Sequence, residues 1–233
     1  MMLTPEETTA LLLSMKVAFW CMVISLLPGI ALAWLLARVN FFGKSLLDAL
    51  VHLPMVLPPV VPGYLLLVLL GGNGVIGKFI SDWFGVSFAF NWMGAVLASL
   101  VMGLPLLVQP IRLSLQLVDS RLENAARTLG AGPWRVFFTI TLPLALPGIL
   151  VGAILSFSRS LGEFGATITF VGNIEGETRT LPLAIYSYVH QPGGDAPAMR
   201  LIWISVGLAL AALLASNVIT RRVQQQLGYR DHA

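Results

Sequence analysis

Charged residues and cysteine are scarce in this chain of 233 residues. Asp, Glu, Lys and Arg make up 11% of the sequence, whereas soluble domains carry roughly 25%. Such a chain has too few polar side chains to cover a soluble globular domain, and 57% of hydrophobic residues excludes intrinsic disorder. The single cysteine, Cys21, excludes a disulfide scaffold. This composition, with a mean hydropathy of +0.84, is typical of a helical membrane protein with several spans.

Motifs for metal binding and hydrolysis are also missing from the sequence. The three histidines are far apart, and no paired cysteines, H-E-x-x-H or G-x-S-x-G pattern occurs. The segment Gly72–Phe79 begins like a phosphate-binding loop, G-x-x-x-x-G-K, but Phe79 stands where Ser or Thr would hold Mg²⁺. We therefore expect no metal, no cofactor, no nucleotide site and no enzymatic activity in this chain, so that a partner has to supply any energy.

Long apolar runs are what the sequence has in abundance. A transmembrane helix needs roughly 17–25 mostly apolar residues, and five segments meet this condition, at about 11–37, 47–70, 91–113, 136–170 and 201–220. Prolines inside these runs are compatible with spanning, because neighbouring helices satisfy the backbone groups that they free. The sequence therefore predicts an all-α polytopic membrane protein with five transmembrane helices, in which residues 1–233 form a single domain.

Lys and Arg are distributed unevenly between the two sides of these spans. Four fall on one side, and nine fall on the other, at Arg38, Lys44, Arg112, Arg121, Arg127, Arg135, Arg221, Arg222 and Arg230. Cytoplasmic segments carry the excess of positive charge, so the N-terminus is predicted outside and the C-terminus in the cytoplasm. The cations form no basic stripe, and no nucleic-acid partner is expected. On the outer side, the apolar stretch in the glycine-rich segment 71–91 predicts a short interfacial helix.

The predicted cytoplasmic loop at 114–135 contains signals for a short helix. Asp119 or Ser120 can cap its N-terminus, with Glu123 in the first turn, and Gly130 and Gly132 can end it. Small side chains at two successive alanines would let another protein approach this helix closely. The alternative is an ordinary loop helix that lies on the membrane surface.

The same loop resembles a motif of a known family. Asn124-Ala125-Ala126, Gly130 and Ile140-x-Leu142-Pro143 match the E-A-A-x-x-x-G-x9-I-x-L-P pattern of ABC importer permeases, except that Asn124 replaces the acid and Glu123 lies one residue earlier. The resemblance implies a coupling loop that docks into a groove of an ATPase subunit and is formed by Glu123, Asn124, Ala125, Ala126, Arg127, Gly130 and Gly132. It leaves open which side chain makes the contact of the motif's acid.

Within these permeases the chain is most similar to the molybdate type, through residues 52–61, 127–143 and 160–170. The resemblance implies the permease fold and the import of an oxyanion, molybdate or tungstate, across the cell inner membrane. It also implies a homodimer of permeases that works with two ATP-binding subunits and an extracytoplasmic solute-binding protein, embedded in the lipid bilayer.

Two charged residues lie in or near the fourth span, where an unpaired charge is costly. Arg159 and Glu163 are four residues apart, so on a helix they share a face and can pair. Direct contact with a permeating anion is the alternative, although Glu163 would repel it. Ser160 and Thr167 can line a pathway or form hydrogen bonds between helices.

Two other functions compete with molybdate import. A permease for sulfate, thiosulfate or another small anion would transport a solute of similar size and charge. A self-sufficient channel or carrier would belong to a different class, but it has no need of a cytoplasmic helix with the Ala-Ala-x-x-x-Gly pattern. The loop at 114–135 therefore favours an importer that works with an ATPase.

Overall fold

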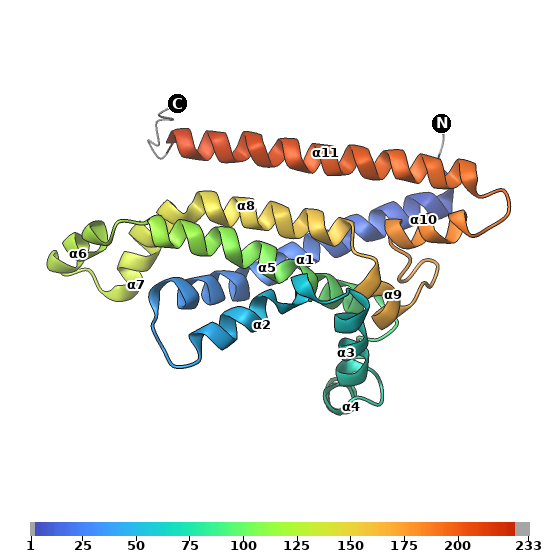
Figure 1. Ribbon diagram of the computed structural model, residues 1–233, viewed down its shortest axis with the longest axis horizontal. Coiled ribbons are helices and arrows are strands. Elements are labelled where there is room, and N and C mark those ends of the chain that lie inside the picture. Colours follow the sequence, from blue (N-terminus) through green and yellow to red (C-terminus); the bar gives the residue numbers. More distant parts are fainter. Residues whose placement is uncertain (1–2, 227–233) are drawn as a thin grey trace.

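The computed structural model describes residues 3–226 and is helical throughout, without strands in that range. Its four longest helices lie alongside one another in Figure 1: α1 (Pro5–Arg38), α5 (Trp92–Leu117), α8 (Leu142–Leu161) and α11 (Asp195–Gln226). Four helical segments of the described chain are long and apolar enough to cross a membrane, and the bent pair of α2 (Lys44–Val56) and α3 (Val60–Leu70) makes a fifth when counted as one span. The predicted all-α polytopic class is therefore confirmed, while Arg230 of the basic tail lies outside the described residues.

Helix α5 is the centre of the bundle, since 61% of its apolar window is buried inside the chain, compared with 11% for α11. Glycines on its neighbours allow close packing. A Cβ on Gly152 of α8 would lie 2.6 Å from the carbonyl oxygen of Leu107, and a Cβ on Gly29 of α1 would collide with the Leu107 side chain. Because glycine has no side chain, Gly29 and Gly152 thus allow α1 and α8 to lie close to α5 at the crossings.

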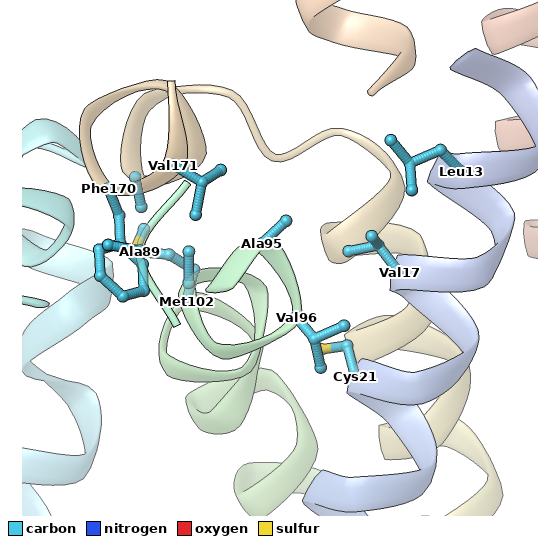
Figure 2. Packing of buried hydrophobic residues seen from close by; sticks show 11 residues of the cluster. Leu13, Val17, Cys21, Ala89, Ala95, Val96, Met102, Phe170 and Val171 are labelled. Carbon is cyan, nitrogen blue, oxygen red and sulfur yellow. The ribbon is translucent and has the colours of Figure 1, made fainter. Parts of the chain in front are cut away.

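Two apolar clusters fill the space around α5. One of them joins Val17 and Cys21 of α1 to Val96 of α5, and it continues to Phe170 and Val171 at the end of α9 (Gly165–Val171) (Figure 2). The other cluster lies further along the same helices and includes Leu36, Leu107 and Ile111. Apolar side chains from α1, α5 and α8 thus pack together along the length of the bundle.

The segment predicted as one span at 47–70 is broken in the structure. Helix α2 ends at Val56, helix α3 begins at Val60, and their axes are bent by 114°. Pro58 and Pro59 lie at the break, where they lack N–H donors and disfavour a helical residue before them. Helix α3 therefore leaves the direction of the long helices, as Figure 1 shows.

The segment predicted as one span at 136–170 also departs from a single helix. It begins at the end of α7 (Pro133–Val136), continues as a π-helical turn over Phe137–Thr141, and becomes α8. Helix α8 ends at Leu161, and a short break precedes α9. Such π-helical turns are rare in proteins, and those that occur are often found at functional sites.

Three short helices lie at the ends of the long ones. Helix α4 (Val75–Phe84) occupies the segment where an interfacial helix was predicted, and it exposes Phe79 and Trp83, whose rings stack at 5.5 Å. Helix α6 (Ser120–Thr128) projects from one end of the bundle, while α10 (Leu181–Val189) lies near the N-terminus at the other end (Figure 1). The loop with the permease motif is therefore far from the N-terminus.

The crossing of α3 and α9 provides a first test of this packing. A Cβ at Gly63 would lie 2.6 Å from the carbonyl oxygen of Ala166 and 2.8 Å from its Cα. These are backbone atoms that cannot rotate away, so we expect Gly63→Val to lower the free energy of unfolding by about 1–3 kcal/mol, the usual cost of overpacking. The measurement is thermal unfolding in detergent.

The control for this experiment is Gly72→Val, because a Cβ at Gly72 meets nothing within 4 Å. We expect this variant to unfold within a degree or two of the unmodified protein. Equal stability of the two variants would contradict the close packing of α3 on α9.

Candidate functional site: a projecting loop and a junction of broken helices

Helix α6 has the local signals that the sequence predicts. The Asp119 carboxylate accepts a hydrogen bond from the backbone N–H of Arg121 at 2.8 Å and caps the N-terminus. At the other end, Gly130 has a φ of 84°, in the left-handed region that glycine favours. The N–H of Ala131 returns to the carbonyl of Ala126 at 3.0 Å. These bonds end α6 sharply and turn the chain into α7.

The outward face of α6 consists of small and apolar side chains. Its members share the spacing i, i+3, i+4 and i+7, and they are Leu122, Ala125, Ala126 and Leu129. Leu129 is 89% exposed, and Trp134 of the adjoining α7 is also exposed. Exposed apolar side chains on an otherwise charged loop are typical of a surface that contacts another protein or a membrane. Arg127, Gly130 and Gly132 are exposed beside this outward face.

Glu123 points away from the outward face and into the protein. It is only 9% exposed, and its Oε1 lies 3.0 Å from Nη2 of Arg38 at the end of α1. The same oxygen accepts a hydrogen bond from the Thr141 hydroxyl at 2.7 Å. Asn124, at the position of the motif's acid, is exposed. Glu123 therefore contacts its own chain in this structure, and the docking group of the coupling loop stays a prediction.

The second part of the site is the junction where the two broken spans meet. A Cβ on Gly165, at the start of α9, would lie 2.7 Å from the Cβ of Pro59 at the break between α2 and α3. Gly63 of α3 crosses α9 at Ala166. Non-helical backbone at membrane depth is tolerated only where protein buries it or where it lines a wet cavity. Two of the three stretches similar to molybdate permeases thus contact each other.

A buried ion pair holds this junction, and it is the pair that the sequence predicts. Nη1 of Arg159 lies 2.6 Å from Oε2 of Glu163, which is almost fully buried. The other carboxylate oxygen of Glu163 accepts a hydrogen bond from the N–H of Ala166 at 2.9 Å. A single carboxylate therefore joins the end of α8 to the first turn of α9 across the break.

The hydroxyl residues predicted near this pair are buried inside the chain. Ser160 and Thr167 have little accessible surface, whereas the side chain of Arg159 is 29% exposed. The hydroxyls of Ser99, Ser156 and Ser160 have no hydrogen-bond partner within the described part of the chain. In this conformation Arg159 is thus the one member of the predicted pathway group that reaches the surface.

Sequence reasoning did not identify Arg38 and Thr141 as partners of Glu123. Arg38 is 85 residues away in the chain and Thr141 is 18 residues away, so no helical or strand period connects them. The one available signal is chemical: a carboxylate next to an apolar segment needs a cation. Arg38 meets that need because it follows directly after a long uncharged run.

The sequence of this chain is similar to those of known transport proteins. Residues 29–229 match the family described as binding-protein-dependent transport system inner membrane component. The molybdenum transport system permease protein ModB of Escherichia coli K12 is 59% identical across 98% of this chain and 100% of the relative. ModB of Haemophilus influenzae is 58% identical, across 95% of this chain and 97% of its own length. The sulfate transport system permease protein CysT of E. coli K12 is 35% identical across 97% of this chain and 79% of its own length.

Solved structures of transporters share the fold. A bacterial ABC transporter that imports the acidic polysaccharide alginate gives a TM-score of 0.75 at 19% identity, across 94% of this chain and 80% of that one. The MetNI methionine ABC transporter gives a TM-score of 0.64 at 18% identity, across 93% of this chain and 94% of that one. At these identities the likeness shows the architecture alone.

The buried pair at the junction makes a direct prediction. Glu163→Gln keeps the size of the side chain but leaves Arg159 without its counterion. Because Arg159 is partly exposed, we expect a loss of about 3 kcal/mol in the free energy of unfolding, the low end of the range for a broken buried pair. Thermal unfolding in detergent and transport by the assembled complex are the two measurements.

The matched control is Glu175→Gln, which breaks an Arg–Glu pair with the same spacing of four residues, to Arg179 at 3.0 Å. Glu175 has a side chain that is 52% exposed, so the expected change is within about 1 kcal/mol. Unchanged stability of Glu163→Gln with lost transport would instead assign the pair to the pathway. If neither property changed, the pair would have no role.

Proposed function

The chain belongs to the family of binding-protein-dependent transport system inner membrane components, and we propose that it is the membrane-spanning permease subunit of an ABC importer for molybdate. The identity to the two ModB permeases over nearly the whole chain carries this conclusion. It exceeds the identity to the sulfate permease by a wide margin. Tungstate, an oxyanion of similar size and charge, is expected to follow the same route.

The energy for import comes from a partner in this proposal. Helix α6 offers the outward face of Leu122, Ala125, Ala126 and Leu129 to a groove on an ATP-binding subunit. We place α6 in the cytoplasm and the N-terminus outside, following the distribution of Lys and Arg. A solute-binding protein then delivers the anion at the opposite end, near α10.

The translocation pathway forms between two copies of the permease in this proposal. Closed symmetric association is the common route by which identical chains complete a shared pore. ATP binding draws the two ATPases together, the two α6 helices follow them, and the pathway opens outward to receive the anion. The junction of α3 and α9 supplies irregular backbone, which is tolerated at membrane depth where it lines a water-filled pathway. Arg159 is a partly exposed cation at that junction.

A permease for sulfate is the second candidate, because a sulfate permease is also a relative over nearly the whole chain. Sulfate and molybdate have the same charge and similar shape. The permease shares the selection between them with the binding protein that delivers the anion. The substrate therefore has to be measured in the assembled complex.

Reconstitution into liposomes with the ATPase and the binding protein tests both candidates. We expect ATP-dependent uptake of labelled molybdate that unlabelled tungstate inhibits and an equal concentration of sulfate does not. ATP-dependent uptake of sulfate without molybdate uptake would overturn the substrate. Uptake by the permease alone, without the ATPase, would show a channel or carrier.

The outward face of α6 gives a prediction for the docking of the ATPase. Ala126→Trp places a bulky ring among small side chains, so it should wedge the two proteins apart while the spans still fold. We expect at least a tenfold loss of co-purified ATPase, which corresponds to about 1.4 kcal/mol, at normal membrane levels of the permease. Ala196→Trp is the control, since Ala196 is exposed at the opposite end of the bundle. An intact complex with unchanged ATP hydrolysis would show that α6 is not the docking element.

A further inference from the structure

Four segments of the chain meet at the buried carboxylate of Glu123. The guanidinium of Arg38 reaches it from the end of α1, and the Thr141 hydroxyl reaches it from the π-helical turn before α8. The same Nη2 of Arg38 lies 3.4 Å from the carbonyl oxygen of Val118, directly after α5. The carboxylate thus joins α6 to the ends of three long helices.

Glu123 is the only residue of α6 whose side chain is buried. All other residues of this helix are exposed or half-buried, including the four of the outward face. Beyond the peptide chain at its two ends, α6 is therefore fastened to the bundle mainly through one side chain. Hydrogen bonds between ionised groups away from water are roughly twice as strong as neutral ones, so this single attachment is a firm one.

The π-helical turn brings the hydroxyl of Thr141 to this carboxylate. Thr141 is itself buried, and it is the residue directly before α8. The wider turn over Phe137–Thr141 changes the rotation of the helix by about one residue relative to a regular α-helix. Helix α8 is continuous from Leu142 to Leu161, with Pro147 inside it, so it connects Thr141 to the end that carries Arg159.

We propose that Glu123 is a positioning residue for energy coupling: it fastens α6 to α1 through Arg38 and to α8 through Thr141, so that both helices move with α6. The proposal rests on the proposed function, because the ATPase is what displaces α6. In this chain the acid lies on the inner side of the helix, one residue before the motif position, and neutral Asn124 occupies that exposed position. In this proposal Glu123 transmits the movement of α6 to α1 and α8, whereas the outward face of α6 binds the ATPase.

The experiment uses the complete complex of permease, ATPase and binding protein in liposomes. Glu123→Gln keeps the shape and an acceptor for Thr141 but removes the charge that holds Arg38. We expect the ATPase to co-purify as with the unmodified permease and ATP hydrolysis to continue. The amount of molybdate imported per ATP hydrolysed should fall at least tenfold.

Two further variants separate a coupling role from a purely structural one. Thr141→Val removes one hydrogen bond and keeps the shape, so it should lower the import-to-hydrolysis ratio less, by about two- to fivefold. The exchange of charges, Arg38→Glu with Glu123→Arg, should restore part of the ratio lost in Glu123→Gln. Lys44→Gln is the control, because Lys44 is a cation at the same end whose side chain bonds to Asn40 and to no other residue in the described part of the chain. Its ratio should stay within twofold.

Each outcome decides the proposal. Loss of the ATPase from the complex with Glu123→Gln would show that Glu123 faces the partner, and it would overturn the positioning role. An unchanged ratio in both Glu123→Gln and Thr141→Val would overturn it as well. If Glu123→Gln fails to fold, an unchanged ratio in Thr141→Val alone is sufficient to do so. Absence of ATP-dependent uptake with the unmodified permease would instead remove the proposed function, and the coupling role with it.

Discussion

A carboxylate that leaves water needs a cation beside it, and this constraint determines how the helices of the chain are joined. Three carboxylates are buried in the described part of the chain, and each contacts an arginine within 3.0 Å: Glu7 with Arg200, Glu123 with Arg38, and Glu163 with Arg159. Removal of one partner would leave a buried charge without compensation. Each pair therefore fixes which two segments lie together, because separating them would leave a buried charge unpaired.

The three ion pairs lie near the ends of the long helices, where each connects two segments of the chain. Glu7 ties the start of α1 to α11, which is otherwise little buried. Glu123 joins the projecting α6 to α1 and to the beginning of α8, and Glu163 joins the end of α8 to α9. Helix α8 has 20 residues, a length of about 30 Å, and thus connects the end that carries α6 with the junction of broken helices. In the proposed mechanism, it links the ATPase at one end with the pathway at the other.

The fold and the site were predictable from sequence where the determining forces are local. The Asp119 cap, the left-handed Gly130 and the pair of Arg159 with Glu163 depend on residues a few positions apart, and the structure contains all three. The break between α2 and α3 was not predicted, because prolines such as Pro58 and Pro59 are also tolerated within unbroken spans. The partners of Glu123 escaped prediction because they depend on the arrangement of whole helices, which no sequence period reveals.

In the proposed mechanism, α6 and α1 move as one body when ATP binds. The most direct test is a distance between spin labels at Arg121 of α6 and Ala31 of α1, both exposed, in complexes with one labelled permease copy and Cys21 replaced by serine. We expect the same narrow distance distribution without nucleotide and with ATP, and a broadened or shifted distribution in Glu123→Gln when ATP is bound. A distance that changes with ATP in the unmodified permease as much as in the variant would show that Glu123 does not hold α6 to α1.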